Sequence, residues 1–260
     1  MCIISNEIKF VKNTKILCAL SDDRKKQLIV YGNEIDNVTN NNAMILPVPN
    51  PQTIKFHDLS NYTEIFYDCS KCFYRNTFGI KSISKSASLI IYDVGSYQVS
   101  IAMDLNELQM VDNTIFTMSP KLNDFLTKNY NDMNFGFIIC KLKKNNNKYH
   151  PFCYSHNLLN NKIFIPTKHY HVHNVMQLLY LFLPFNNNMS DDWSHEIYLY
   201  NVKPNEQILN MNSSTEIWCN KSYLKNNKFD FLFGNCIKFT KICIIGKHEN
   251  IDFEINNCEM

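Results

Sequence analysis

The sequence predicts a β-dominated α+β protein, with antiparallel sheets and two or so helices packed on them. Three observations indicate this class. Short β-rich runs recur along most of the 260 residues, turn residues separate them, and only two segments carry helix spacing with helix caps. No internal repeat is visible. We therefore expect a single domain over residues 1–260, with the loop at 143–148 as the candidate place for a subdivision.

The first fifth of the chain predicts strands. Residues 1–5, 14–20 and 27–31 are β-rich, and Asp- and Gly-containing turns separate them. Residues 43–51 then carry proline at every second position from Pro47 onward. Because proline donates no ladder hydrogen bond, we expect an edge strand or a polyproline-like crossing segment there.

The middle of the chain predicts a hairpin and two helices. Residues 88–92 and 97–103 flank a Gly-Ser turn and form the clearest hairpin signal. Asp104 with Glu107 resembles a capping box for a short helix through Met110, and Ser119-Pro120 begins a helix that runs to Tyr130. Later strands are expected at residues 135–142, 162–166, 169–173, 195–200, 236–245 and 251–255.

Composition argues against several classes of function. A net charge of only +2 gives no strongly basic face for nucleic acid, and six glycines form no phosphate-binding Gly-rich loop. The longest apolar run, residues 178–185, is shorter than the ~20 residues that span a bilayer. The ten cysteines are scattered and no export signal opens the chain, which indicates free thiols in the cytoplasm.

Asparagine comes in runs at residues 40–42, 145–147 and 186–188. Together with many Lys, Ile, Phe and Tyr residues, these runs are typical of a very AT-rich genome, such as that of a giant DNA virus or an AT-rich protist. The runs themselves predict polar loops.

Histidine recurs at every second residue in His169, His171 and His173. In an extended strand these side chains share one face, and neighbouring rungs lie about 7 Å apart, close enough to share an ion. His150 or His195 would supply a further ligand, and zinc with an open position would activate a water. The alternative is that these imidazoles face water or bind core carbonyls.

Cysteine offers two weaker candidates. Removal of Met1 would leave Cys2 as an N-terminal nucleophile with its own amine as base, although a structural role is the favoured interpretation. Cys69 and Cys72 form a single C-x-x-C, which is half of a zinc site or a redox pair. No second C-x-x-C accompanies them, so two unrelated thiols are expected.

Several segments resemble a mostly bacterial domain family of unknown function. The segments are Leu46-Pro47-Val48-Pro49, the "VGxYxV" stretch at residues 94–99, and Pro166-Thr167-Lys168-His169-Tyr170-His171. The similarity covers residues 43–173. It implies a shared hydrophobic framework and no particular activity.

Two functions follow as expectations. The first is a metal-dependent or cysteine-based hydrolase with a histidine-rich site. The alternative is a non-catalytic viral or protist protein-interaction module in a multi-subunit complex, because no specific catalytic motif is present. Its partners would be proteins rather than membranes or nucleic acids, and residues 175–185 would form either a docking surface or core.

Overall fold

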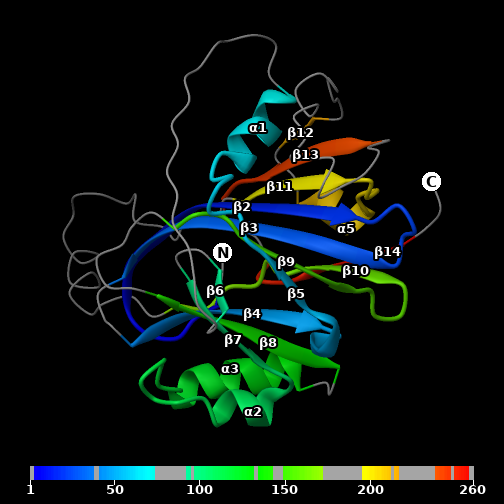
Figure 1. The fold of residues 1–260 in the computed structure, drawn as a ribbon. Coiled ribbons are helices and arrows are strands. Elements are labelled where there is room, and N and C mark those ends of the chain that lie inside the picture. Colours follow the sequence, from blue (N-terminus) through cyan, green and yellow to red (C-terminus); the bar gives the residue numbers. More distant parts are fainter. Residues whose placement is uncertain are drawn as a thin grey trace.

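Two large sheets pack face to face in the computed structural model, and helices cover their outer surfaces (Figure 1). The structure describes residues 3–37, 41–73, 92–94, 97–131, 134–142, 149–171, 195–211, 214–216, 238–246 and 249–257. The sheets and helices of these residues confirm the β-dominated α+β class. The loop at 143–148 and the apolar run at 175–185 lie outside the described residues.

The seven-stranded sheet has the order β12-β13-β11-β2-β3-β9-β5. Its neighbours are antiparallel except for the parallel pair β11 and β2. The hairpin of β2 and β3 is longer than the sequence predicts, because a bulge between Lys12 and Lys15 carries the pairing past the charged residues. The strands are β2 (Ile8–Leu20), β3 (Lys26–Asn37), β5 (Lys55–His57), β9 (Phe152–Asn157), β11 (His195–Tyr200), β12 (Ser214–Glu216) and β13 (Phe239–Ile244).

The five-stranded sheet is antiparallel throughout, in the order β1-β4-β8-β7-β6. The proline-containing strand β4 pairs with β8 along its whole length, whereas β1 pairs only with Met44 and Ile45. Pro47 and Pro49 lie beyond the end of β1, so β4 is an edge only in that half. The strands are β1 (Ile3–Ile4), β4 (Asn42–Pro49), β6 (Tyr92–Val94), β7 (Tyr97–Ala102) and β8 (Phe135–Leu142).

A two-stranded sheet of β10 (Lys162–Ile165) and β14 (Phe253–Asn256) lies beside the core. Gln27, which is fully buried in β3, ties it to the seven-stranded sheet. The Gln27 Nε2 group donates to the carbonyl of Phe164 at 2.6 Å, and the Phe164 N–H donates back to Gln27 Oε1 at 2.8 Å. A buried glutamine is stable here because both halves of its amide are paired.

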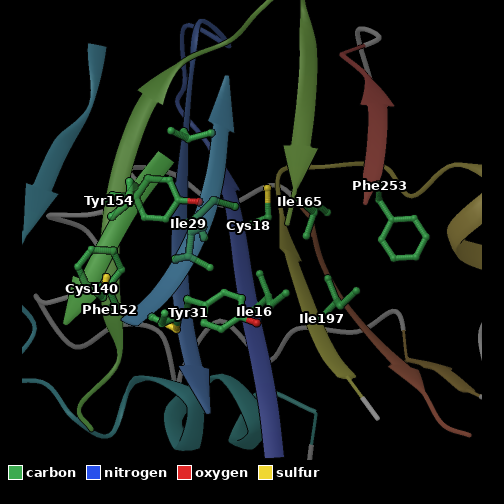
Figure 2. Packing of buried hydrophobic residues seen from close by; sticks show 14 of the residues in the cluster. Ile16, Cys18, Ile29, Tyr31, Cys140, Phe152, Tyr154, Ile165, Ile197 and Phe253 are labelled. Carbon is green, nitrogen blue, oxygen red and sulfur yellow. The ribbon is translucent and has the colours of Figure 1, made fainter. Parts of the chain in front are cut away.

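The main core lies between the sheets and draws on all three of them. Figure 2 shows Ile16, Ile29, Phe152, Ile197 and Phe253 converging from five strands. Alternate residues of β2 and β3 face the opposite side, where they pack against α1 (Ile65–Lys71). This alternation is what period-two patterning in a strand produces.

The outer face of the five-stranded sheet is covered by α2 (Leu105–Gln109) and α3 (Pro120–Tyr130). Both begin where the sequence predicts: Asp104 accepts from the N–H of Glu107 at 2.8 Å, and Ser119 accepts from the N–H of Leu122 at 3.1 Å. Two further short helices are η1 (Pro51–Thr53) and α5 (Glu206–Asn210). Among the described residues, no helix has both the length and the apolar character needed to cross a bilayer.

Candidate functional site

The histidine segment is extended but does not belong to a sheet. After β10 ends at Ile165, the chain continues without regular pairing through His171, and a single parallel bridge joins Tyr170 to Ile3. The N–H of Ile4 donates to the carbonyl of Tyr170 at 2.7 Å. The segment therefore lies directly against β1, the first described strand of the chain.

Side chains take the place of a strand partner along this segment. Asp252 Oδ1 accepts from the N–H groups of Thr167 at 2.9 Å and Lys168 at 2.7 Å. Asn250 then accepts from the N–H of His169 and donates to its carbonyl, both at 2.8 Å. Three consecutive backbone N–H groups are thus satisfied by two residues of the C-terminal segment, which explains why no sheet ladder forms here.

Asp252 also receives a short hydrogen bond of 2.5 Å from the hydroxyl of Tyr130 at the end of α3. Burial raises the pKa of the Asp252 carboxyl, and its hydrogen bonds and the nearby Lys168 oppose that rise. This carboxylate joins the helix layer, the histidine segment and the C-terminal segment at one point.

Within the clamped segment, His169 and His171 lie side by side. Their ring centroids are 6.0 Å apart with an interplanar angle of 34°. The two rings are thus close together, but the predicted strand at residues 169–173 is wrong for its described part, where Tyr170 forms a single bridge. His173 lies outside the described residues.

His195 is the predicted residue that the fold brings to this place. It opens β11, and it lines a pocket of about 20 Å³ together with His169, Glu249 and Thr167. Both histidines are more than nine-tenths buried. The volume is sufficient for about one water molecule, so the pocket offers no room for an organic substrate as it stands.

His150 lies in a different environment. Its ring packs edge-on against Tyr97, with centroids 5.2 Å apart, and its Nδ1 is 2.9 Å from the carbonyl of Pro151. The described residues contain no group of three or more His, Cys, Asp or Glu side chains placed to hold a metal ion. Zinc binding at the histidines therefore stays a prediction.

Of the two predicted cysteine sites, the structure describes only one. Cys2 lies outside the described residues, so its role as a nucleophile stays a prediction. Cys69 and Cys72 lie on and just after α1, buried against the seven-stranded sheet. None of the six cysteines in the described part of the chain forms a disulfide.

Sequence reasoning missed a groove lined by basic residues at the other end of the seven-stranded sheet. It consists of two adjoining pockets that share Lys26 and Asn157 in their walls. The signal for it in the sequence is the consecutive basic triplet Arg24-Lys25-Lys26, which runs from the turn after β2 into the first residue of β3. Triplets of this kind are common on protein surfaces, so the residues contributed by β5 and β9 could only be found in the structure.

Comparison with known proteins gives a similarity at the level of the fold. No family model matches the chain. The crystal structure of baculovirus P35 matches with a TM-score of 0.55 and 14% identity, over 99% of this chain and 100% of that one. At this identity the match shows a shared fold.

Two further structures of the same neighbour match with lower scores. A mutated baculovirus P35 after caspase cleavage has a TM-score of 0.49 and 11% identity, covering 94% of this chain and 99% of that one. A caspase-8/P35 complex has a TM-score of 0.40 and 14% identity, covering 80% and 70% of the two chains. These scores add nothing to the fold argument. The predicted relationship to the bacterial domain family stays a prediction.

Proposed function

We propose that this chain is a viral protein-interaction protein whose partner is a caspase. One observation carries the proposal, namely that the fold match to baculovirus P35 extends over both chains almost from end to end. P35 itself forms a complex with caspase-8, and a mutated P35 has been cleaved by a caspase. The composition, which is typical of an AT-rich genome, agrees with a viral source.

The match supports an interaction role better than a hydrolase. The match covers 99% of this chain and 100% of P35, so it is not limited to a common sub-structure such as one hairpin. A shared fold does not by itself transmit a function, so binding must be measured directly.

The test mixes the purified chain with active caspase-8 and follows three readouts. These are co-elution on gel filtration, the rate at which the caspase hydrolyses a fluorogenic peptide, and cleavage of the chain on a denaturing gel. We expect a co-eluting complex and a reduced rate of peptide hydrolysis when the chain is present at micromolar concentration. The heat-denatured chain is the control, because it offers the same sequence without the fold. An unchanged hydrolysis rate together with separate elution would refute the proposal for this caspase.

Zinc binding at the histidines is a separate candidate, favoured by the fact that His169 and His195 line one pocket. Elemental analysis of the purified chain tests it. About one zinc per chain is expected, and His169→Ala should remove it while His150→Ala should not, since His150 packs against Tyr97 instead. Zinc content near zero in the wild-type chain would end this candidate.

A further inference from the structure

Three separate segments form the groove at the end of the seven-stranded sheet. One pocket, of about 290 Å³, is lined by residues of η1, β5 and β9, namely Gln52, Thr53, Ile54, Lys55, His156 and Asn157, with Lys26 from β3. The second, of about 400 Å³, adds the turn between β2 and β3 and the loop after β9. Figure 1 shows these segments meeting at the end of the molecule that also holds the tip of the β2–β3 hairpin.

Hydrogen bonds hold the walls of the groove in place. The N–H of Asn157 donates to Thr53 Oγ1 at 2.9 Å, and Asn50 Nδ2 donates to the carbonyls of Asn157 and Leu158 at 3.2 and 2.9 Å. The turn is braced by Asp23, whose carboxylate accepts from Ser21 Oγ at 2.6 Å. A preformed groove of this kind loses little conformational entropy when a ligand binds.

The charge in the groove has one predominant sign. Four basic side chains line the two pockets, Arg24, Lys25, Lys26 and Lys55, against the single carboxylate of Asp23. None of the three lysines forms an ion pair with another described residue. Hydrogen bonds from Ser21 and the N–H of Lys25 lower the pKa of the Asp23 carboxyl, so it is ionised and offsets one of the four positive charges, which leaves three in excess.

The histidine in the lining of the first pocket is uncharged. His156 is 1% exposed, and burial lowers its pKa to about 4, so the ring is neutral at pH 7. Its Nδ1 lies 2.9 Å from the carbonyl of Asn157, which can only accept, so Nδ1 carries the proton. The groups that the groove exposes to a ligand are therefore the side chains of Lys26 and Lys55 and the amides of Gln52 and Asn157, whereas His156 is buried beneath the surface.

We infer that this groove binds an acidic peptide segment of a protein partner, with carboxylates seated at Lys26 and Lys55. Charge complementarity selects an anionic occupant, and two adjoining pockets that share Lys26 suit successive acidic side chains of an extended peptide. The amides of Gln52 and Asn157 are suited to the backbone of such a peptide. Nucleic acid fits less well, because no Phe, Tyr or Trp lines either pocket to stack on a base.

This inference is independent of caspase binding, since it depends only on the geometry and charge of the groove. Its test measures the fluorescence anisotropy of a labelled peptide of about eight residues that alternates Glu with Gly, a spacing that suits an extended chain. A single-stranded oligonucleotide of equal charge is the competing probe. Binding should weaken as salt rises from 0.05 to 0.5 M, because the contacts are exposed to screening.

The decisive variant is Lys26→Glu with Lys55→Glu. Its matched control is Lys121→Glu with Lys128→Glu, which changes net charge equally at exposed positions of α3 on the other sheet. We expect the groove variant to weaken peptide binding by about tenfold or more, and the control by less than about twofold. Circular dichroism checks that both variants fold.

Three outcomes would overturn the inference. The first is an equal loss in the two variants, which would mean that only overall charge attracts the peptide. The second is tighter binding of the oligonucleotide with the same sensitivity to the groove variant, which would make the groove a nucleic-acid site. The third is the absence of measurable peptide binding at low salt.

Discussion

His156 should make this fold lose stability in mild acid. Its ring is buried beside Tyr154, with the two rings stacked at 6.1 Å and 19°, and its Nε2 has no hydrogen-bond partner among the described residues. Protonation of the His156 ring would place a positive charge in this buried position. Burial accordingly lowers the pKa of His156 from 6.5 to about 4.

The size of the effect follows from proton linkage. The unfolded chain takes up a proton near pH 6.5, whereas the folded chain does so only near pH 4. Stability from the neutral ring is therefore complete above pH 6.5 and is lost as the pH falls toward 4. Each pH unit between the two values costs about 1.4 kcal/mol, which gives a loss of about 3 kcal/mol in the free energy of unfolding.

His156→Leu tests this reasoning, because leucine is close in volume and does not titrate. The carbonyl of Asn157 keeps its hydrogen bond from Asn50 Nδ2 at 3.2 Å, so the substitution leaves that acceptor paired. Urea unfolding at intervals between about pH 7 and 4.5 measures the free energy of unfolding of both proteins. We expect a flatter profile for the variant, with the two curves converging or crossing in acid.

His57→Leu is the comparison variant. Burial also lowers the pKa of His57, but its ring is only half-buried and binds Ser155 Oγ at 2.9 Å, so removing it should flatten the profile less. If wild type and His156→Leu lose the same free energy of unfolding across this range, the assignment of the acid sensitivity to His156 is wrong.

Three further predictions concern other parts of the fold. Asp252→Asn should gain stability relative to wild type as the pH rises from about 4 to 7, because burial raises the pKa of Asp252 and the folded state favours its protonated form. Urea unfolding at several pH values measures this difference, and the opposite trend would mean that the carboxylate is stabilising. Gly136→Ala should lower the free energy of unfolding, measured with urea, by about 3 kcal/mol, because the added Cβ would lie 2.4 Å from Cβ of Pro51. A loss below about 1 kcal/mol would contradict that close approach. Asn250→Ala should cost about 1–3 kcal/mol and speed hydrogen exchange at the amide of His169, whereas an unchanged exchange rate would show that the clamp is not what protects it.

Local signals predicted α2 and α3, because caps act within one turn of the chain, whereas α1 and α5 were not predicted. Asp104 and Ser119 each bind an N–H group three residues ahead, which needs no knowledge of the rest of the fold. Strand ends were harder to predict. The strand β2 begins at Ile8, six residues before the predicted start, because register shifts let its charged first half pair with β3 as well.

Strands β5 and β9 were missed for a related reason. Their side chains include Ser155, His156 and His57, which no apolar alternation identifies, and their pairing joins segments about one hundred residues apart. The groove lined by these strands was invisible to sequence reasoning for that reason.

The candidate site shows the same division between local and distant effects. Period-two spacing predicted the pairing of His169 with His171, since only the local backbone direction matters. The residues that hold the segment, Asn250 and Asp252, are more than eighty positions away and act through side-chain bonds to backbone groups. No periodicity reports such a bond, so the sequence predicted a sheet strand where the structure has a clamped segment.

A fold shared at 14% identity leaves most surface residues free to differ, so the match to P35 constrains the sheets more than any binding surface. The groove at Lys26 and Lys55 depends on surface side chains and on a braced turn, which the fold alone does not require. The proposed caspase complex and the proposed acidic-peptide groove are therefore separable hypotheses about one scaffold. The groove variant in the caspase assay distinguishes them: unchanged inhibition would place the two partners on different surfaces, and lost inhibition would show that the caspase itself uses the groove.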